Sequence, residues 1–257
     1  MKSVLRTKIA RQLIFFAVIV VGWELLFRLK LWPPYIFPSP FAVGSSLIGG
    51  ILDGAYPIGI GVSMTRILIG FALSIAIGLP LGLLIGRVAF LSDTFGSVLN
   101  GLQTLPSICW RPLALIWFGL NESAILFVVV MGAVLSIAIA AEGGVKNTPP
   151  QYLRAAHNLG ARGWRLYRHV IFPAALPSIL TGLRLGWSFA WRSLMAGELI
   201  YITLGLGQLL AMRRDLNDLS QVMAVMLVII ALGLTVDRAV FSPLERNVRQ
   251  RWGLSPR

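Results

Sequence analysis

Long apolar runs constrain the fold of this sequence more than any other feature. A helix needs about 20 predominantly apolar residues to cross the ~30 Å hydrocarbon core of a bilayer. Six stretches satisfy this requirement, at about 12–30, 60–86, 94–118, 122–142, 174–200 and 220–241. The 257 residues are 56% hydrophobic and 13% charged, with a mean hydropathy of +0.78, which excludes an ordinary soluble domain. Outer-membrane barrel alternation is absent, so the sequence predicts an all-α polytopic membrane protein.

The number of spans depends on the first run, which is the weakest. Glu24 interrupts it and stands four residues before Arg28, a spacing that favours an ion pair on one helix face. We expect six transmembrane helices, and five spans with an interfacial first helix are the alternative.

The distribution of Lys and Arg predicts the orientation. With a cytoplasmic N-terminus, 15 of the 23 basic residues fall on the cytoplasmic side, 5 fall outside, and Arg111, Arg184 and Arg192 fall within spans. This excess agrees with the positive-inside rule. It predicts a cytoplasmic segment at 151–172 and a cytoplasmic tail at 242–257. The net charge of +13 therefore reflects membrane topology, and no nucleic-acid partner is expected because no RNA-binding signature accompanies it.

The segment 151–172 is the long polar interval of the second half of the chain. It contains four Arg and no acid, and each Arg would cost about 2.5 to 3.5 kcal/mol at the bilayer centre. Gly160 interrupts its helical spacing, which resumes until Pro173. Two short helices with a corner between them are predicted. Ala155 and Ala156 leave a shallow face that another protein can approach closely.

This spacing resembles a motif of a known family. Ala155, Ala156, Gly160, Val170 and Pro173 are similar to the EAA loop in the permease subunits of ABC importers. The family's leading Glu is Arg154 in this sequence, so a contact through that carboxylate is not available here. Further stretches are similar to the nitrate, sulfonate, taurine and bicarbonate branch of these permeases, in the same order along the chain: 38–43, 102–122 and 237–253.

The resemblance implies a type I ABC importer permease made of one transmembrane domain, 1–257, in a bacterial inner (plasma) membrane. It implies a homodimer, two ATP-binding cassette subunits below it, and a periplasmic or lipid-anchored solute-binding protein above it. ATP and Mg would bind to the partner ATPase, and no cofactor to this chain. The residues expected to couple to that ATPase are Arg154, Ala155, Ala156, Leu159, Gly160 and Pro173.

Two local patterns predict packing. Ser39 can cap a short helix within 38–53 that begins at Pro40 and lies on the outer membrane surface. The second span carries a small residue at every fourth position, which allows close helix approach in a membrane: Gly70, Ser74, Gly78, Gly82 and Gly86.

Candidates for the translocation path come from polar residues and prolines inside apolar runs. Pro106 and Pro112 break the third span, and broken helices often line transport paths. Arg111 beside Pro112 is the first candidate to meet an anionic substrate, with a satisfied structural Arg as the alternative. Arg192 and Glu198 point about 240° apart on one helix, so neither can satisfy the other and each needs a different partner. The candidate set is Trp110, Arg111, Pro112, Arg192 and Glu198.

The sequence lacks the motifs of an enzyme. It contains no G-x-x-x-x-G-K-[ST] phosphate loop, nucleophile elbow or H-E-x-x-H pair, and no metal site is expected. We expect an ATP-driven importer of a small anion such as a sulfonate, nitrate or taurine-like solute. An ion-gradient-driven secondary transporter is the alternative, for which Glu198 is the strongest coupling carboxylate, and a non-transporting scaffold would leave Arg111 and Arg192 without a purpose.

Overall fold

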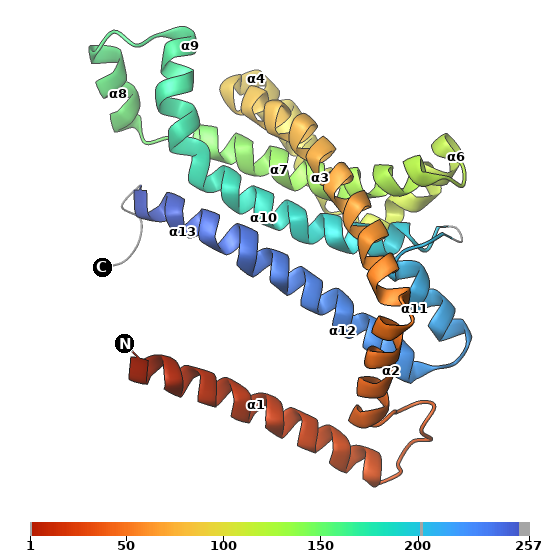
Figure 1. The fold of residues 1–257 in the computed structure, drawn as a ribbon. Helices are drawn as coiled ribbons and strands as arrows, with labels where there is room; N and C mark the ends of the chain where they lie inside the picture. Colours follow the sequence, from red (N-terminus) through yellow and green to blue (C-terminus); the bar gives the residue numbers. More distant parts are fainter. Residues whose placement is uncertain (1, 201–202, 252–257) are drawn as a thin grey trace.

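A computed structural model describes residues 2–200 and 203–251, and these residues form helices without a strand (Figure 1). The last six residues of the predicted tail, 252–257, lie outside the described part. The elements in chain order are α1 (Lys2–Arg28), α2 (Pro40–Leu52), α3 (Ala55–Arg87), α4 (Ala89–Leu91), η1 (Ser92–Gly96), α5 (Ser97–Gln103), η2 (Ser107–Trp110), α6 (Arg111–Phe118), α7 (Glu122–Lys146), α8 (Pro150–Asn158), α9 (Gly163–Leu166), η3 (Tyr167–Ile171), α10 (Phe172–Gly197), α11 (Leu206–Asp215), α12 (Leu219–Val236), η4 (Asp237–Phe241) and α13 (Ser242–Arg251).

Five helical stretches of the described chain are long and apolar enough to cross a membrane: Ala10–Arg28, Ala55–Arg87, Glu122–Lys146, Gly163–Gly197 and Leu219–Val248. They overlap five of the six predicted runs. In the first, Arg28 Nε donates a hydrogen bond to Glu24 Oε1 at 2.7 Å, which confirms the predicted ion pair.

The stretch 94–118, predicted as one span broken at its prolines, is interrupted in the structure. The structure divides the stretch among part of the π-helical turn η1, the helix α5, the 3-10 turn η2 and the helix α6. The break falls where Pro106 adopts an extended conformation, with φ −55° and ψ 140°. A proline cannot donate the backbone hydrogen bond that a continuing helix requires, so the chain re-enters a helix only after a gap.

The helices α3, α7 and α10 pack together at the centre of the molecule (Figure 1). Their shared buried cluster includes Ile67, Phe71, Ile125, Val129 and Trp187. Phe71 and Trp187 meet edge to face, with ring centroids 5.2 Å apart. This contact joins α3 to α10, two helices that are far apart in the sequence.

The small-residue stripe of α3 lies against α7. A Cβ atom at Gly78 would stand 2.7 Å from the carbonyl oxygen of Val134, and one at Gly82 would collide with the backbone of Ala138. Ser74 is fully buried in the same stripe. Only a residue without a side chain allows backbones to approach this closely, so the stripe sets the distance between α3 and α7.

The helix α2 begins as the sequence predicts. Ser39 Oγ accepts a hydrogen bond from the backbone N–H of Ala42 at 3.1 Å, and Pro40 occupies the first helical position. Trp23 of α1 donates its indole N–H to the carbonyl of Pro38 at 2.9 Å. Apart from this junction α1 stands away from the bundle, and the side chains of its apolar stretch are exposed (Figure 1).

Candidate functional site

An elbow formed by α8, α9 and η3 projects from one end of the bundle (Figure 1). Its corner is Gly160, whose φ of +79° lies in the left-handed region that favours glycine. The backbone N–H of Ala161 donates to the carbonyl of Ala156 at 2.9 Å and closes the first helix. Leu159 lies at this corner and is 88% exposed, so its side chain forms an apolar surface that a partner can cover.

A hollow of about 570 Å³ lies between α8 and the start of α10. Its lining includes Tyr152, Ala155, Ala156, Leu159 and Pro173, so four of the six predicted coupling residues border it. Arg154 is exposed on the same helix but does not line the hollow. The arrangement provides a shallow apolar groove beside basic side chains.

The elbow is attached to the bundle at two points. Its second arm continues without a break from η3 into α10. Tyr167 of this arm is buried, donates its hydroxyl to the carbonyl of Leu83 on α3 at 3.3 Å, and lies 5.6 Å beneath the Arg87 guanidinium. The elbow is therefore continuous with α10 and in contact with the end of α3.

The elbow and α2 lie at opposite ends of the molecule (Figure 1). The 33 residues of α3 extend from beside α2 to the contact with Tyr167, which is about 50 Å at 1.5 Å per residue. This length exceeds the hydrocarbon thickness of a bilayer. The two ends can therefore lie on different sides of one membrane.

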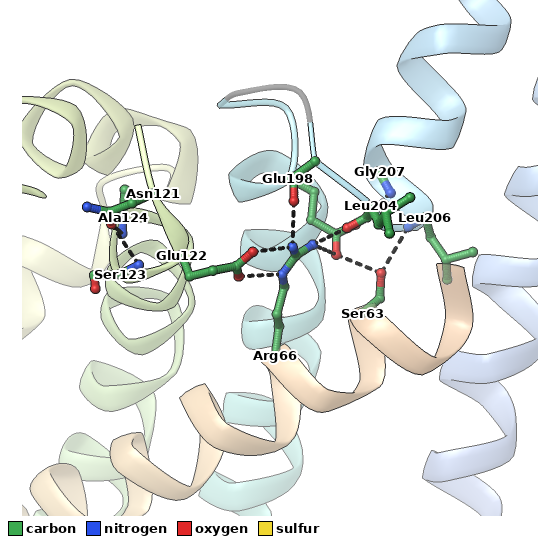
Figure 2. A network of polar contacts seen from close by, with 11 residues as sticks. Ser63, Arg66, Asn121, Glu122, Ser123, Ala124, Glu198, Leu204, Leu206 and Gly207 are labelled. Carbon is green, nitrogen blue, oxygen red and sulfur yellow. Dashed lines mark hydrogen bonds and ion pairs between the residues drawn. The ribbon is translucent and has the colours of Figure 1, made fainter. Parts of the chain in front are cut away.

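At the end of the bundle away from the elbow, Arg66 connects three segments of the chain (Figure 2). Its Nε donates to Glu122 Oε2 at 2.7 Å, and its Nη1 donates to Glu198 Oε1 at 3.0 Å. It also donates to Thr203 and to the carbonyl of Leu204. The guanidinium thus joins α3 to the start of α7, to the end of α10 and to the segment before α11.

Glu198 is fully buried and its carboxylate is satisfied by further donors. Ser63 Oγ donates to Oε1 at 2.6 Å, and the backbone N–H of Gly207 donates to Oε2 at 2.7 Å (Figure 2). Its partners lie on α3 and α11, and Arg192 is not among them. As the helical geometry predicts, Arg192 and Glu198 do not pair.

A second hollow, of about 390 Å³, lies between the broken segment, α7 and α10. Two predicted path residues, Trp110 and Arg192, line it. Arg111, Pro112 and Glu198 do not line it. Arg111 instead donates through Nη2 to the carbonyl of Leu199 at 2.9 Å, which is the structural role weighed as its alternative.

The sequence did not indicate most of the polar residues of the Arg66 network or of the second hollow. Arg66 lies six residues into the predicted span 60–86, and its acids are 56 and 132 residues away. Only its position inside an apolar run signalled that it needs a partner. Gln103 and Ser136 of the second hollow meet through a hydrogen bond of 3.2 Å, which no local pattern indicates.

Comparisons with known proteins match this arrangement to one family. A family model described as "Binding-protein-dependent transport system inner membrane component" matches residues 78–250. The chain belongs to this family. The permease family includes the taurine transport system permease protein TauC of Escherichia coli strain K12, to which the chain is 32% identical over 196 residues, 74% of this chain and 71% of that protein.

Two further comparisons support the assignment. The nitrate import permease protein NrtB of Synechocystis is 28% identical over 242 residues, 91% of this chain and 87% of that protein. A chain of the MetNI methionine ABC transporter, solved in inward facing conformations, is 20% identical and has a TM-score of 0.66 over 77% of this chain and 97% of that chain. The structural likeness confirms the predicted all-α permease architecture.

Proposed function

We propose that this permease forms the path of an ATP-driven importer for a small anion, and that the elbow couples the path to a separate ATPase. The observation that carries the proposal is the projecting, basic elbow with its apolar groove at one end of the bundle. An ABC permease without a phosphate-loop motif needs an external source of nucleotide energy. ATP and Mg would bind to that partner, and this chain would hold no cofactor.

The assembly would consist of two copies of this chain, two ATPase subunits at the elbows and a solute-binding protein at the opposite end. Closure of the ATPases on ATP would tilt the elbows, and each elbow would move α10 and the end of α3 as a rigid body. The excess of Lys and Arg at the elbow end supports a cytoplasmic location for this end and for both termini. The chain would lie in the bacterial inner membrane.

The coupling residues would have distinct roles. Ala155 and Ala156 would let the partner approach the groove closely, and Leu159 would insert its exposed side chain into the partner. Gly160 would hold the corner, and Pro173 would form the wall of the groove at the start of α10. Arg154 would give this chain a basic contact where the related loops have a carboxylate.

The charge of the substrate is proposed from two observations. The permease relatives are named for taurine and nitrate, and the second hollow is lined by Arg192, which forms no ion pair with a carboxylate of the described residues. A solute-binding protein would select the substrate before it reaches the path. The ion-gradient alternative is not favoured, because Glu198, its candidate coupling carboxylate, is enclosed by Arg66, Ser63 and Gly207.

A pull-down with the ATPase subunit tests the coupling proposal. Ala155→Glu places a carboxylate on the exposed rim of the groove, and we expect loss of ATPase association and of uptake. Gln151→Glu makes the same charge change on the same helix outside the groove lining, and association should persist. Full association of the Ala155→Glu variant would refute the proposal.

A further inference from the structure

The hollow beside the broken segment has the size and lining of a ligand site. Its volume of about 390 Å³ falls in the range of pockets that hold small molecules. The apolar part of the lining includes Leu105, Ile108 and Trp110, and the polar part includes Gln103 and Ser136. Such a lining suits a ligand with a polar head and a short apolar body.

Arg192 supplies the only cationic side chain among the described residues that line the hollow. Its Nε donates to the carbonyl of Ser188 on its own helix at 3.3 Å, and its guanidinium carbon stands 4.8 Å from the Phe189 ring centroid. No carboxylate within residues 2–200 and 203–251 forms an ion pair with it. The two terminal nitrogens of its guanidinium therefore have capacity for an anion.

Two other arginines that lie within long helices, Arg66 of α3 and Arg184 of α10, are paired with carboxylates. Arg66 binds two carboxylates, and Arg184 binds Asp237 through two hydrogen bonds of 2.7 and 2.8 Å. An intramembrane arginine normally has such a partner or faces a polar cavity. Arg192 has the cavity and lacks the carboxylate.

The face of α10 that carries Arg192 is open and mostly polar. Thr181, Leu185, Ser188 and Arg192 follow one another at helical spacing, and all four side chains are exposed. The hydroxyls of Thr181 and Ser188 donate to carbonyls of their own helix, but the Arg192 guanidinium keeps its charge, and a cation that faced lipid would be costly. This stripe therefore fits the wall of an aqueous path that reaches the hollow.

We propose that this hollow is a subsite for a small organic oxyanion, a sulfonate or carboxylate, whose oxygens bind the Arg192 guanidinium. Two oxygens of such a head match the parallel N–H donors of a guanidinium. The apolar body would lie against Trp110 and Ile108, and Gln103 would lie within the same lining. The inference rests on the proposed function, which it deepens by naming the residue in the path that selects the charge of the substrate.

Fluorine NMR on the full chain in lipid nanodiscs tests the proposal. Trifluoromethanesulfonate serves as the anionic probe, and trifluoroethanol and trifluoroethylammonium serve as neutral and cationic probes of similar size. We expect the anion alone to show saturable line broadening. Arg192→Gln should weaken the apparent affinity for the anionic probe about tenfold or more, because a charge-assisted bidentate contact is lost. The affinity of Arg192→Lys should lie between those of the wild type and Arg192→Gln.

Two further variants make the test specific. Arg214→Gln removes an exposed arginine of α11 outside the hollow and should leave the titration unchanged. Ala196→Phe keeps Arg192 and fills the hollow, so it should reduce anion binding even if Arg192→Gln does not fold. Equal anion binding by wild type and Arg192→Gln, undiminished binding by Ala196→Phe, or equal broadening of the cationic probe would overturn the proposal.

The titration is independent of the ATPase. Ala155→Glu changes the elbow and should not alter binding of the sulfonate probe in the isolated chain. Loss of ATPase association with intact anion binding would support both proposals. Persistent ATPase association of that variant with intact anion binding would refute the elbow assignment and support the subsite, so the two proposals fail separately.

Discussion

Arg66 Nη1 donates a hydrogen bond to Glu198 Oε1 at 3.0 Å, which joins the N-terminal part of α3 to the C-terminal end of α10. The Glu198 carboxylate is fully buried, and only 7% of the Arg66 side chain is exposed. The same guanidinium holds Glu122 at the start of α7. The three core helices are therefore tied together at the end opposite to the elbow (Figure 2).

Removing Arg66 should destabilise the chain strongly. Arg66→Gln leaves the buried carboxylate of Glu198 without its cation, and breaking a buried pair in this way costs about 3 to 5 kcal/mol. We expect the thermal unfolding midpoint in detergent to fall accordingly. Arg214→Gln, which breaks an exposed pair with Asp215, should cost less than about 1 kcal/mol. Equal midpoints for the two variants would contradict the assigned role of Arg66.

The close approach of α3 and α7 should be sensitive to a single methyl group. At Gly82 a Cβ collides with the Ala138 backbone, so Gly82→Ala forces the helices apart and should cost about 1 to 3 kcal/mol. Gly61→Ala on the same helix meets nothing within 4 Å and should be neutral or stabilising by up to about 1 kcal/mol. Thermal unfolding of both variants measures the difference. A tolerated Gly82→Ala would show that the two helices pack less closely.

Features that depend on neighbouring residues were readable from the sequence. The Ser39 cap, the elbow corner at Gly160 and the small-residue stripe each follow from spacings of a few positions. The break at Pro106 was likewise signalled by the proline, although the length of the apolar run had placed both sides of the break in one predicted span. Length and hydropathy alone do not report where the backbone hydrogen bonds end.

Features that depend on distant residues were not readable in the same way. Arg66 had to find its acids among segments far along the chain, and no periodicity indicates which acid lies nearby. Arg111 and Arg192 are both cations within apolar runs, and the sequence ranked Arg111 first because it stands beside Pro112. The structure separates them, because the break before α6 turns Arg111 toward the carbonyl of Leu199 and leaves Arg192 at the hollow.

The corner of the elbow should tolerate asparagine better than alanine. Gly160 has a φ of +79°, and nothing lies within 4 Å of a Cβ built there, so only backbone strain opposes a substitution. Gly160→Ala should cost about 1 to 2 kcal/mol, whereas asparagine visits this conformation more readily. Hydrogen exchange of the 151–172 amides should quicken in Gly160→Ala and change less in Gly160→Asn. Equal exchange in both variants would show that the corner relaxes without strain.

The ion pair between Arg184 and Asp237 should couple α10 to the C-terminal helices measurably but weakly. The two side chains are 39% and 31% exposed, so water screens them, although the contact is bidentate. A double-mutant cycle of Arg184→Gln and Asp237→Asn should give a coupling free energy of about 1 kcal/mol, at the upper end for exposed pairs. Arg214 and Asp215, which are neighbours in the sequence and both lie on α11, provide a control cycle. Their coupling should be near zero, because the pair is exposed and does not connect two helices. A coupling no larger than this control would mean that the Asp237 pair adds nothing to the packing and to the second ion pair of Arg184, with Glu245 of α13 at 2.8 Å.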